Sequence, residues 1–223
     1  MTTRNEHADK LKGLYAITDE NLISENDFEK KIEAALLGGV RIIQYRDKSS
    51  DQKKRLHQAE ALRLLCEKHQ AICLINDDIN LAKAVNAHGV HLGKNDESIS
   101  QARKILGENA IIGSSCYNDI SLAKIAEKNS ADYVAFGAIF SSPTKQNAKV
   151  ASLEILSKAK QYLSIPICAI GGITQNNINQ VIQHNADMTA IISDIFSSNN
   201  IKSHAEKLHS HYIKLNSTTI FKV

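Results

Sequence analysis

The sequence predicts an α/β protein built as a single (β/α)8 TIM barrel. Three observations support this prediction. Short apolar segments of strand length recur eight times along the 223 residues, amphipathic stretches separate them, and no linker rich in proline, glycine or serine interrupts the series. Repeating units of roughly 25 residues, each with one strand and one helix, are typical of this barrel.

Each apolar segment predicts one strand, because aliphatic and β-branched residues cluster over a length that a buried strand needs. An open, doubly wound sheet is the alternative arrangement, and the near-regular series of eight units weighs against it. The predicted strands are residues 13–18, 40–46, 71–76, 88–93, 110–115, 132–137, 165–170 and 187–193.

Helices are expected between the strands, where apolar residues recur at three- and four-residue spacing. The clearest such stretches are residues 27–39, 51–69 and 119–131. We therefore expect one helix after each strand and one domain spanning residues 1–223. Residues 1–10 and 216–223 are expected to be its peripheral ends.

The composition is that of an ordinary globular protein, with 43% hydrophobic residues and a formal net charge of +3. Lysine and arginine are dispersed among acidic residues, which argues against nucleic acid and membrane surfaces as partners. Small molecules are the expected partners, and a homodimer is compatible with the sequence. The amino-terminal segment lacks the apolar core of a signal peptide, so a cytoplasmic location is expected.

Cysteine and histidine do not form a metal motif in the sequence. The four cysteines lie far apart without a C-x-x-C pair, as expected for reduced, structural thiols. His88 and His91 are three residues apart on a predicted strand and would face opposite sides. Core or solvated roles are therefore expected for these histidines.

The segment "IIQYRDK" ends an apolar strand in three polar residues spaced two apart: Gln44, Arg46 and Lys48. Alternation along a strand places such residues on one face, so the three side chains would leave the barrel on the same side. Two cations and an amide would then converge on one place. The pattern predicts an anionic ligand there.

Polar residues follow most of the other predicted strands, at the edge where the active sites of such barrels lie. Taken singly, Asp77 and Asp96 could be helix caps or loop residues, and the glycine pair could be a turn. Taken together, two carboxylates on adjacent strand ends suit Mg²⁺, which normally takes one or two of them. The residues that follow these strands are Asn76, Asp77, Asp96, Ser115, Ser142, Thr144, Lys145 and Ser193, together with the glycine pair Gly171 and Gly172.

With Arg46, Lys48 and Lys145 around such a metal, the ligand predicted on this side is a diphosphate. The loops after strands 7 and 8 are the customary phosphate site of the fold, and Gly171, Gly172 and Ser193 lie there. Two phosphate sites facing one another predict two phosphorylated substrates or one long one.

These motifs resemble the thiamine-phosphate synthase family. "YAITD", "QYRDK", "NDD", "GVHLG", "SPTK", "AIGGI" and "AIIS" occur in the family's order over nearly the whole chain. The resemblance implies a transferase of thiamine biosynthesis. It would join a hydroxymethylpyrimidine diphosphate to a thiazole phosphate, giving thiamine phosphate and pyrophosphate, with Mg²⁺ as cofactor.

The resemblance also implies roles for individual residues. Gln44, Arg46, Lys48 and Asn76 would contact the pyrimidine diphosphate, and Asp77 and Asp96 would hold Mg²⁺. Ser115 and Lys145 would contact the leaving pyrophosphate, so that Arg46, Lys48, Ser115 and Lys145 form the catalytic set. The thiazole phosphate would be held by Ser142, Thr144, Gly172, Ile192 and Ser193.

Three residues depart from the family's usual pattern. Lys94 stands where glutamine is usual, His88 replaces an acidic residue, and Ser141 occupies a position where proline is common. Two other functions fit part of the pattern. A relative that isomerises the thiazole phosphate would not need both aspartates together with Arg46 and Lys48, all of which this chain has. A non-catalytic thiamine phosphate sensor would keep the phosphate site but show no turnover.

Overall fold

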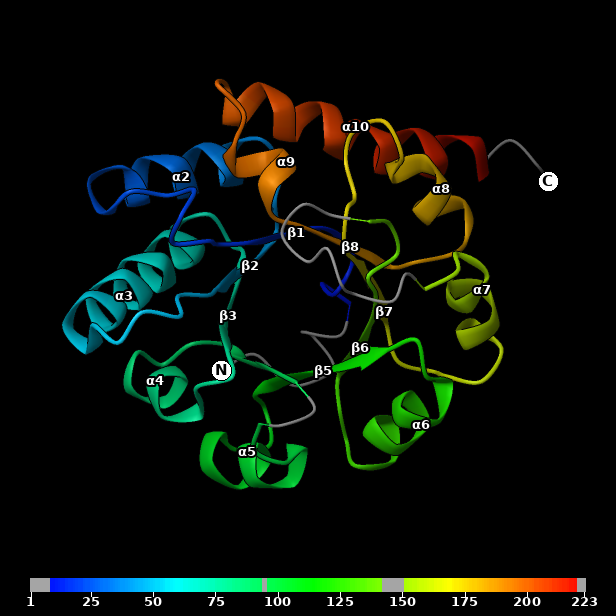
Figure 1. Cartoon of the computed structure of the whole chain (residues 1–223), viewed down its shortest axis with the longest axis horizontal. Coiled ribbons are helices and arrows are strands. Elements are labelled where there is room, and N and C mark those ends of the chain that lie inside the picture. Colours follow the sequence, from blue (N-terminus) through cyan, green and yellow to red (C-terminus); the bar gives the residue numbers. More distant parts are fainter. Residues whose placement is uncertain (1–8, 94–95, 142–150, 220–223) are drawn as a thin grey trace.

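The structure, a computed structural model, describes residues 9–93, 96–141 and 151–219. Eight parallel strands close into a barrel in sequence order, and β8 returns to pair with β1 (Figure 1). The predicted (β/α)8 barrel is thereby confirmed, and every predicted strand appears. The strands are β1 (Gly13–Ile17), β2 (Ile42–Tyr45), β3 (Ile72–Asn76), β4 (Gly89–Leu92), β5 (Ile111–Tyr117), β6 (Tyr133–Phe136), β7 (Ile167–Ile170) and β8 (Met188–Ile191).

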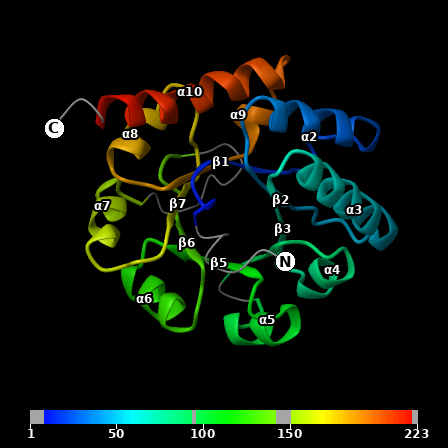
Figure 2. The same ribbon diagram turned by 180° about the vertical axis from the view of Figure 1, so that it is seen from behind.

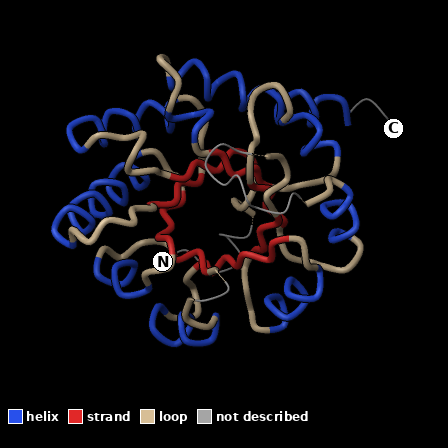
Figure 3. Tube along the Cα trace, viewed as in Figure 1, coloured by secondary structure: helices blue, strands red, loops and turns tan. Residues whose placement is uncertain are grey.

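The helices form an outer ring around the strands (Figure 3), and the view from behind shows the same ring (Figure 2). Side chains cap the amino-terminal ends of several helices: Asp51, Ser98 and Asp119 accept hydrogen bonds from backbone N–H groups of the first helical turn. The helices are η1 (Glu25–Asp27), α2 (Phe28–Leu37), α3 (Gln52–Lys68), α4 (Ile79–Ala84), α5 (Ile99–Leu106), α6 (Ile120–Lys128), α7 (Glu154–Lys160), α8 (Ile178–Gln183), α9 (Ser193–Phe196) and α10 (Ile201–Thr219).

The pattern of one helix after each strand does not hold everywhere. The short helix η1 precedes α2, and two helices, α9 and α10, follow β8. Helix α10 also extends through residues 216–219, which were expected to belong to a peripheral end. It packs against α2, so that the last helix lies beside the first α-helix (Figure 1).

Apolar side chains fill two separate layers. The larger layer lies between barrel and helices, and includes Ile43 and Ile75 on the outward face of their strands. The smaller one fills the barrel interior, where Leu74 and Met188 are buried and Leu11 also packs. Burial of each such side chain contributes about 1.5–3 kcal/mol, so both layers hold the strand ends in place.

Ion pairs brace the lower end of the barrel, where the strands begin. Arg103 of α5 donates from Nη2 to Asp132 Oδ2 at 2.7 Å, and that oxygen also accepts from Ile112 N at 2.7 Å. In the same way, Asp187 Oδ2 lies 2.5 Å from Lys160 Nζ and accepts from Ile167 N at 2.6 Å. Each carboxylate thus ties the first residues of a strand to a surrounding helix.

All four cysteines are buried and free, as expected for structural thiols. Among the helices in the described ranges, none is both long and apolar enough to cross a membrane.

Candidate active site

Side chains of the segment 44–48 alternate between the barrel and its helices. Gln44 is buried inside the barrel, where its amide donates to the hydroxyl of Tyr15. The neighbouring Tyr45 packs into the layer between barrel and helices. Asp47 also points that way, and its Oδ2 lies 2.7 Å from Lys54 Nζ of α3. Even-numbered positions therefore face the site, and odd-numbered positions anchor the segment to the scaffold.

Arg46 and Lys48 lie at the upper rim, the end of the barrel where the strands finish. Thr18 fixes the backbone there: its hydroxyl accepts from Arg46 N at 2.7 Å and donates to Arg46 O at 3.0 Å. Glu20 Oε2 lies 3.9 Å from Arg46 Nη1, and Glu20 Oε1 accepts from Lys48 N at 3.2 Å. Sequence reasoning missed Glu20, although its place just after the first strand could have signalled it.

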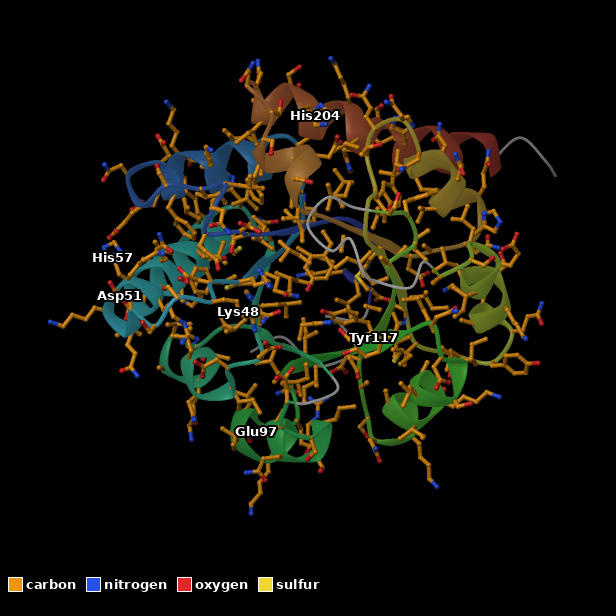
Figure 4. The ribbon with its side chains drawn as sticks, in the orientation of Figure 1. Lys48, Asp51, His57, Glu97, Tyr117 and His204 are labelled. Atoms are coloured by element: carbon orange, nitrogen blue, oxygen red, sulfur yellow. The ribbon has the colours of Figure 1, made fainter. Side chains whose placement is uncertain are left out.

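Asp77 receives hydrogen bonds from both of its predicted neighbours in the site. Lys48 Nζ lies 2.5 Å from Asp77 Oδ2, and Asn76 Nδ2 donates to the same oxygen at 2.6 Å. In Figure 4, Lys48 lies inside the ring of helices, whereas Asp51, which caps α3, and His57 on that helix lie outward. The ends of β2 and β3 thus bring cation, amide and carboxylate together.

Asp78, and not Asp77, caps the helix that follows β3. Asp78 precedes α4 and accepts from Leu81 N at 2.9 Å. Asp77 has a left-handed backbone, with φ of 61°, a conformation that is uncommon outside glycine. Its N–H donates to His91 O at 2.9 Å, which holds the turn against the next strand. Asp77 is therefore left to the site, with its carboxylate on the rim.

Asp96 lies opposite Asp77, and it too does not cap a helix. Ser98 caps α5, while Asp96 Oδ2 accepts from Gly93 N at 2.6 Å. The carboxyl groups of Asp77 and Asp96 lie within hydrogen-bonding reach of each other. Burial and the neighbouring Asp77 raise the pKa of Asp96. Burial also raises the pKa of Asp77, but hydrogen bonds from Lys48 and Asp96 outweigh it and lower that pKa overall.

This pair of carboxyl groups fits a hard divalent cation. Two carboxylates brought together repel one another, and a cation between them would remove that repulsion. In the described ranges, His, Cys, Asp and Glu side chains form no group of three or more that could hold a metal. Two carboxylates leave room for the waters and phosphate oxygens that usually complete the octahedron of Mg²⁺.

A chain of hydrogen bonds crosses the barrel interior below the rim. From Gln44 it passes to Tyr15, whose hydroxyl lies 2.9 Å from that of Tyr133. The Tyr133 hydroxyl lies 2.9 Å from His91 Nδ1, and His91 Nε2 lies 2.8 Å from Ser115 Oγ. Predicted residues of β2 and β5 are thereby joined through three residues that the sequence analysis did not assign to the site. We call this chain of hydrogen bonds, from Gln44 to Ser115, the polar floor of the barrel. It gives hydrogen-bond partners to side chains that would otherwise be buried without them.

His91 is neutral at physiological pH, because burial lowers its pKa to about 4. A neutral imidazole has one donor nitrogen and one acceptor nitrogen, so it can bridge the two hydroxyl groups of Tyr133 and Ser115. The expected core role of His91 is correct, but its link to the rim was missed. Polar residues at inward-facing, alternate strand positions were the signal that could have revealed it.

Residues 138–141, which follow β6, lie against the loop after β7 on the other side of the rim. Gly171 and Gly172 have φ values of 104° and 61°. A Cβ on Gly172 would come within 2.5 Å of Ser141 O, and one on Gly171 within 2.6 Å of Ala138 Cα. Both positions therefore require glycine. The backbone of this loop approaches its neighbour more closely than a side chain would permit.

Ile192 and Ser193 follow β8 on the same side. Ile192 packs onto the barrel interior, and Ser193, the first residue of α9, is exposed. Helix α8, which follows the loop after β7, begins at Ile178. Ser142, Thr144 and Lys145 lie outside the described residues, as does Lys94. His88 Nδ1 accepts from Cys73 N at 3.0 Å, so this departure has a structural contact.

Comparisons with known proteins agree with the motif pattern. The sequence pattern of the thiamine monophosphate synthase family matches residues 14–195. A thiamine-phosphate synthase of Thioalkalivibrio sulfidiphilus is 46% identical over 203 residues, which cover 91% of this chain and 96% of that protein. One of Nitrosococcus oceani is 48% identical over 202 residues, covering 91% and 93%.

A solved structure gives the same result. Thiamine phosphate pyrophosphorylase from Pyrococcus furiosus superposes with a TM-score of 0.85 at 34% identity, covering 94% of this chain and 98% of that one. The family match begins within β1 and ends within α9, so it takes in all the strand ends that form the rim.

Proposed function

This chain belongs to the thiamine monophosphate synthase family, and we propose that it makes thiamine phosphate by joining a hydroxymethylpyrimidine diphosphate to a thiazole phosphate. The observation that carries the proposal is the rim cluster of Lys48, Asp77 and Asp96. It combines a cation for a diphosphate with two carboxylates for a metal, at the end of the barrel where such sites occur.

In this proposal the pyrimidine diphosphate binds between the ends of β2 and β3. Gln44 and Asn76 offer amide groups for the pyrimidine ring, and Arg46 and Lys48 offer positive charge for its diphosphate. The side chains of Arg46 and Lys48 are 29% and 53% exposed, so a ligand at the rim can reach both of them.

Mg²⁺ is the cofactor that we propose for Asp77 and Asp96. Their oxygen-only donor set suits this ion, and both lie beside Lys48. When bound, Mg²⁺ would neutralise part of the diphosphate charge and stabilise pyrophosphate as it leaves. The ion pair of Lys48 and Asp77 keeps the carboxylate ionised and ready for a cation.

The remaining residues would hold the leaving group and the second substrate. Ser115 and Lys145 are assigned to the pyrophosphate. Gly172, Ile192 and Ser193, together with Ser142 and Thr144, are assigned to the thiazole phosphate. The close packing of Gly171 and Gly172 against residues 138–141 supports this half of the proposal, because it brings half-buried backbone without side chains to one edge of the rim.

The reaction needs alignment and charge neutralisation more than proton transfer. The lone pair of the thiazole nitrogen forms a bond to the methylene carbon of the pyrimidine as the C–O bond breaks. The bonding electrons leave with pyrophosphate, and the product carries the positive charge on the thiazolium ring. Neutral His91 suits this chemistry, because it orients the Ser115 hydroxyl without adding charge to the interior.

We further propose a cytoplasmic enzyme whose partners are its two small-molecule substrates, with a homodimer as a compatible assembly. The test is pyrophosphate release by the purified protein, with both substrates and Mg²⁺ and with each component omitted in turn. Release that requires all three components is the expected result. Tight binding of thiazole phosphate without release would instead indicate an isomerase of that compound or a sensor.

A further inference from the structure

One carboxylate, that of Asp194, joins three separate elements behind the proposed thiazole phosphate edge. Asp194 is the second residue of α9 and directly follows Ser193. Its Oδ2 accepts from the backbone N–H of Gln175 at 3.0 Å and lies 2.8 Å from Nε2 of His204. Gln175 belongs to the loop after β7, and His204 to the first turn of α10.

The contact with His204 ties Asp194 to α10, a helix of the outer ring. Figure 4 shows His204 on α10, where that helix lies beside α9. The side chains of His204 and Asp194 are 21% and 19% exposed, so the contact is largely shielded from water. A carboxylate can only accept hydrogen bonds, and His204 therefore carries a proton on Nε2.

The loop after β7 has a second restraint, which acts only within the loop. Asn177 Oδ1 accepts from Thr174 N at 2.8 Å, and Asn177 Nδ2 donates to Gly172 O at 2.9 Å. These bonds fix the shape of the turn but do not fix its distance from β8. The bond from Gln175 to Asp194 supplies that link, because it ties this loop to the residue next to Ser193.

Charge gives the same pair a second role. A carboxylate one residue from Ser193 would repel a phosphate bound there unless it had a partner. Hydrogen bonds from Gln175 and His204 occupy one of its oxygens and hold the group toward the loop and α10. An acidic residue can then stand beside a phosphate edge at little cost to binding.

We propose that Asp194 and His204 are positioning residues, which set the spacing between the loops after β7 and β8 so that both can contact one phosphate. This inference rests on the proposed function. It predicts an effect on the thiazole phosphate alone, because the pyrimidine diphosphate is assigned to the opposite side of the rim.

The test compares KM values for the two substrates in Asp194→Ala, His204→Ala and His204→Gln, with His211→Ala as the matched control. His211 lies on the same helix but contacts Asn179 Oδ1, in the first turn of α8, at 2.7 Å instead of Asp194. Asp194→Ala and His204→Ala should raise KM for thiazole phosphate about tenfold, while KM for pyrimidine diphosphate stays within about twofold. His204→Gln should restore most of the loss, since its amide can donate to Asp194.

Thermal unfolding of each variant shows whether it is folded, and where Asp194→Ala does not fold, the comparison of His204→Ala with His204→Gln carries the test. Equal increases for both substrates, or no rescue by glutamine, would overturn the inference. The proposed function fails in a different way: the unmodified protein itself would then release no pyrophosphate.

Discussion

At the lower end of the barrel Arg103 and Asp132 form a buried ion pair, whereas at the upper rim Asp77 and Asp96 place two carboxyl groups together. Arg103 also donates to the carbonyl groups of Glu108 and Ser130, at 3.1 and 2.9 Å. Charges below are thus paired within the fold, while the rim places a second carboxyl group, that of Asp96, beside the ion pair of Lys48 and Asp77. The difference teaches that the lower end serves stability and that the rim awaits a ligand with charge of its own.

Removing Arg103, the cation at the lower end, should cause the largest change in free energy, and that change is in the free energy of unfolding. Arg103→Met leaves the buried carboxylate of Asp132 without its cation, and we expect unfolding to become easier by about 3–5 kcal/mol. Urea denaturation measures this loss. Lys160→Met is the matched control: it breaks the pair with Asp187, whose side chains are about one-third exposed, and should cost about 1 kcal/mol. A larger loss in the control would contradict the comparison.

Removing a rim carboxylate should affect turnover instead of stability. Asp96→Ala is expected to reduce Mg²⁺-dependent pyrophosphate release about 100-fold, equal to about 2.7 kcal/mol in the barrier. Asp96 is exposed and caps no helix, so the free energy of unfolding should change by less than about 1 kcal/mol. Unchanged release across a Mg²⁺ titration would refute the metal assignment.

Removing a rim cation should affect one substrate more than the other. Arg46→Ala should raise KM for the pyrimidine diphosphate about tenfold, or about 1.4 kcal/mol, and leave KM for thiazole phosphate nearly unchanged. Arg41, just before the start of β2, donates to the carbonyl groups of Leu36 and Val40 and provides the control. Steady-state kinetics with each substrate varied in turn would measure the two KM values separately. Equal changes in both KM values would argue against a two-sided site.

The smallest expected effect is on the pH dependence of stability, and it concerns Asp47, which anchors the segment 44–48 to α3. Burial raises the pKa of Asp47, but hydrogen bonds from Lys54 and Ser49 outweigh it, so the folded pKa lies below the ordinary value. The stabilisation is therefore present above the unfolded pKa and is lost as pH falls through the folded pKa. Asp47→Asn should cost about 1 kcal/mol at neutral pH and less near about pH 3, which lies below the unfolded pKa. Urea unfolding at both pH values tests this, and a constant difference would be the contrary result.

Strand positions were predictable from sequence because each strand is a continuous apolar run between polar turns. The prediction that residues 44, 46 and 48 share a face follows from alternation alone, and Gln44 inside the barrel agrees with it. Helix α9 was not predictable in this way, since four residues are too few to show helical periodicity. The start of α8 at Ile178 was not predictable either, because residues 174–177 form a turn that Asn177 closes before the helix begins.

The polar floor of the barrel depends on information that a single sequence does not contain. Tyr15 and Tyr133 meet because of the register between strands, although they are far apart along the chain. In the same way, the triplet "NDD" leaves open which aspartate caps the helix. The choice falls on Asp78 because Asp77 takes the left-handed turn that leaves β3.

The pairing of β1 with β8 has a consequence for synthesis of the protein. Gly13 lies opposite Met188, so the ring cannot close until nearly the whole chain has left the ribosome. Until then the growing sheet has two open edges, and backbone groups at such edges readily pair with other chains. The last strand and helix α10, which packs over α2, end this exposure together. Premature termination anywhere before β8 would therefore yield a chain prone to aggregation instead of a smaller folded protein.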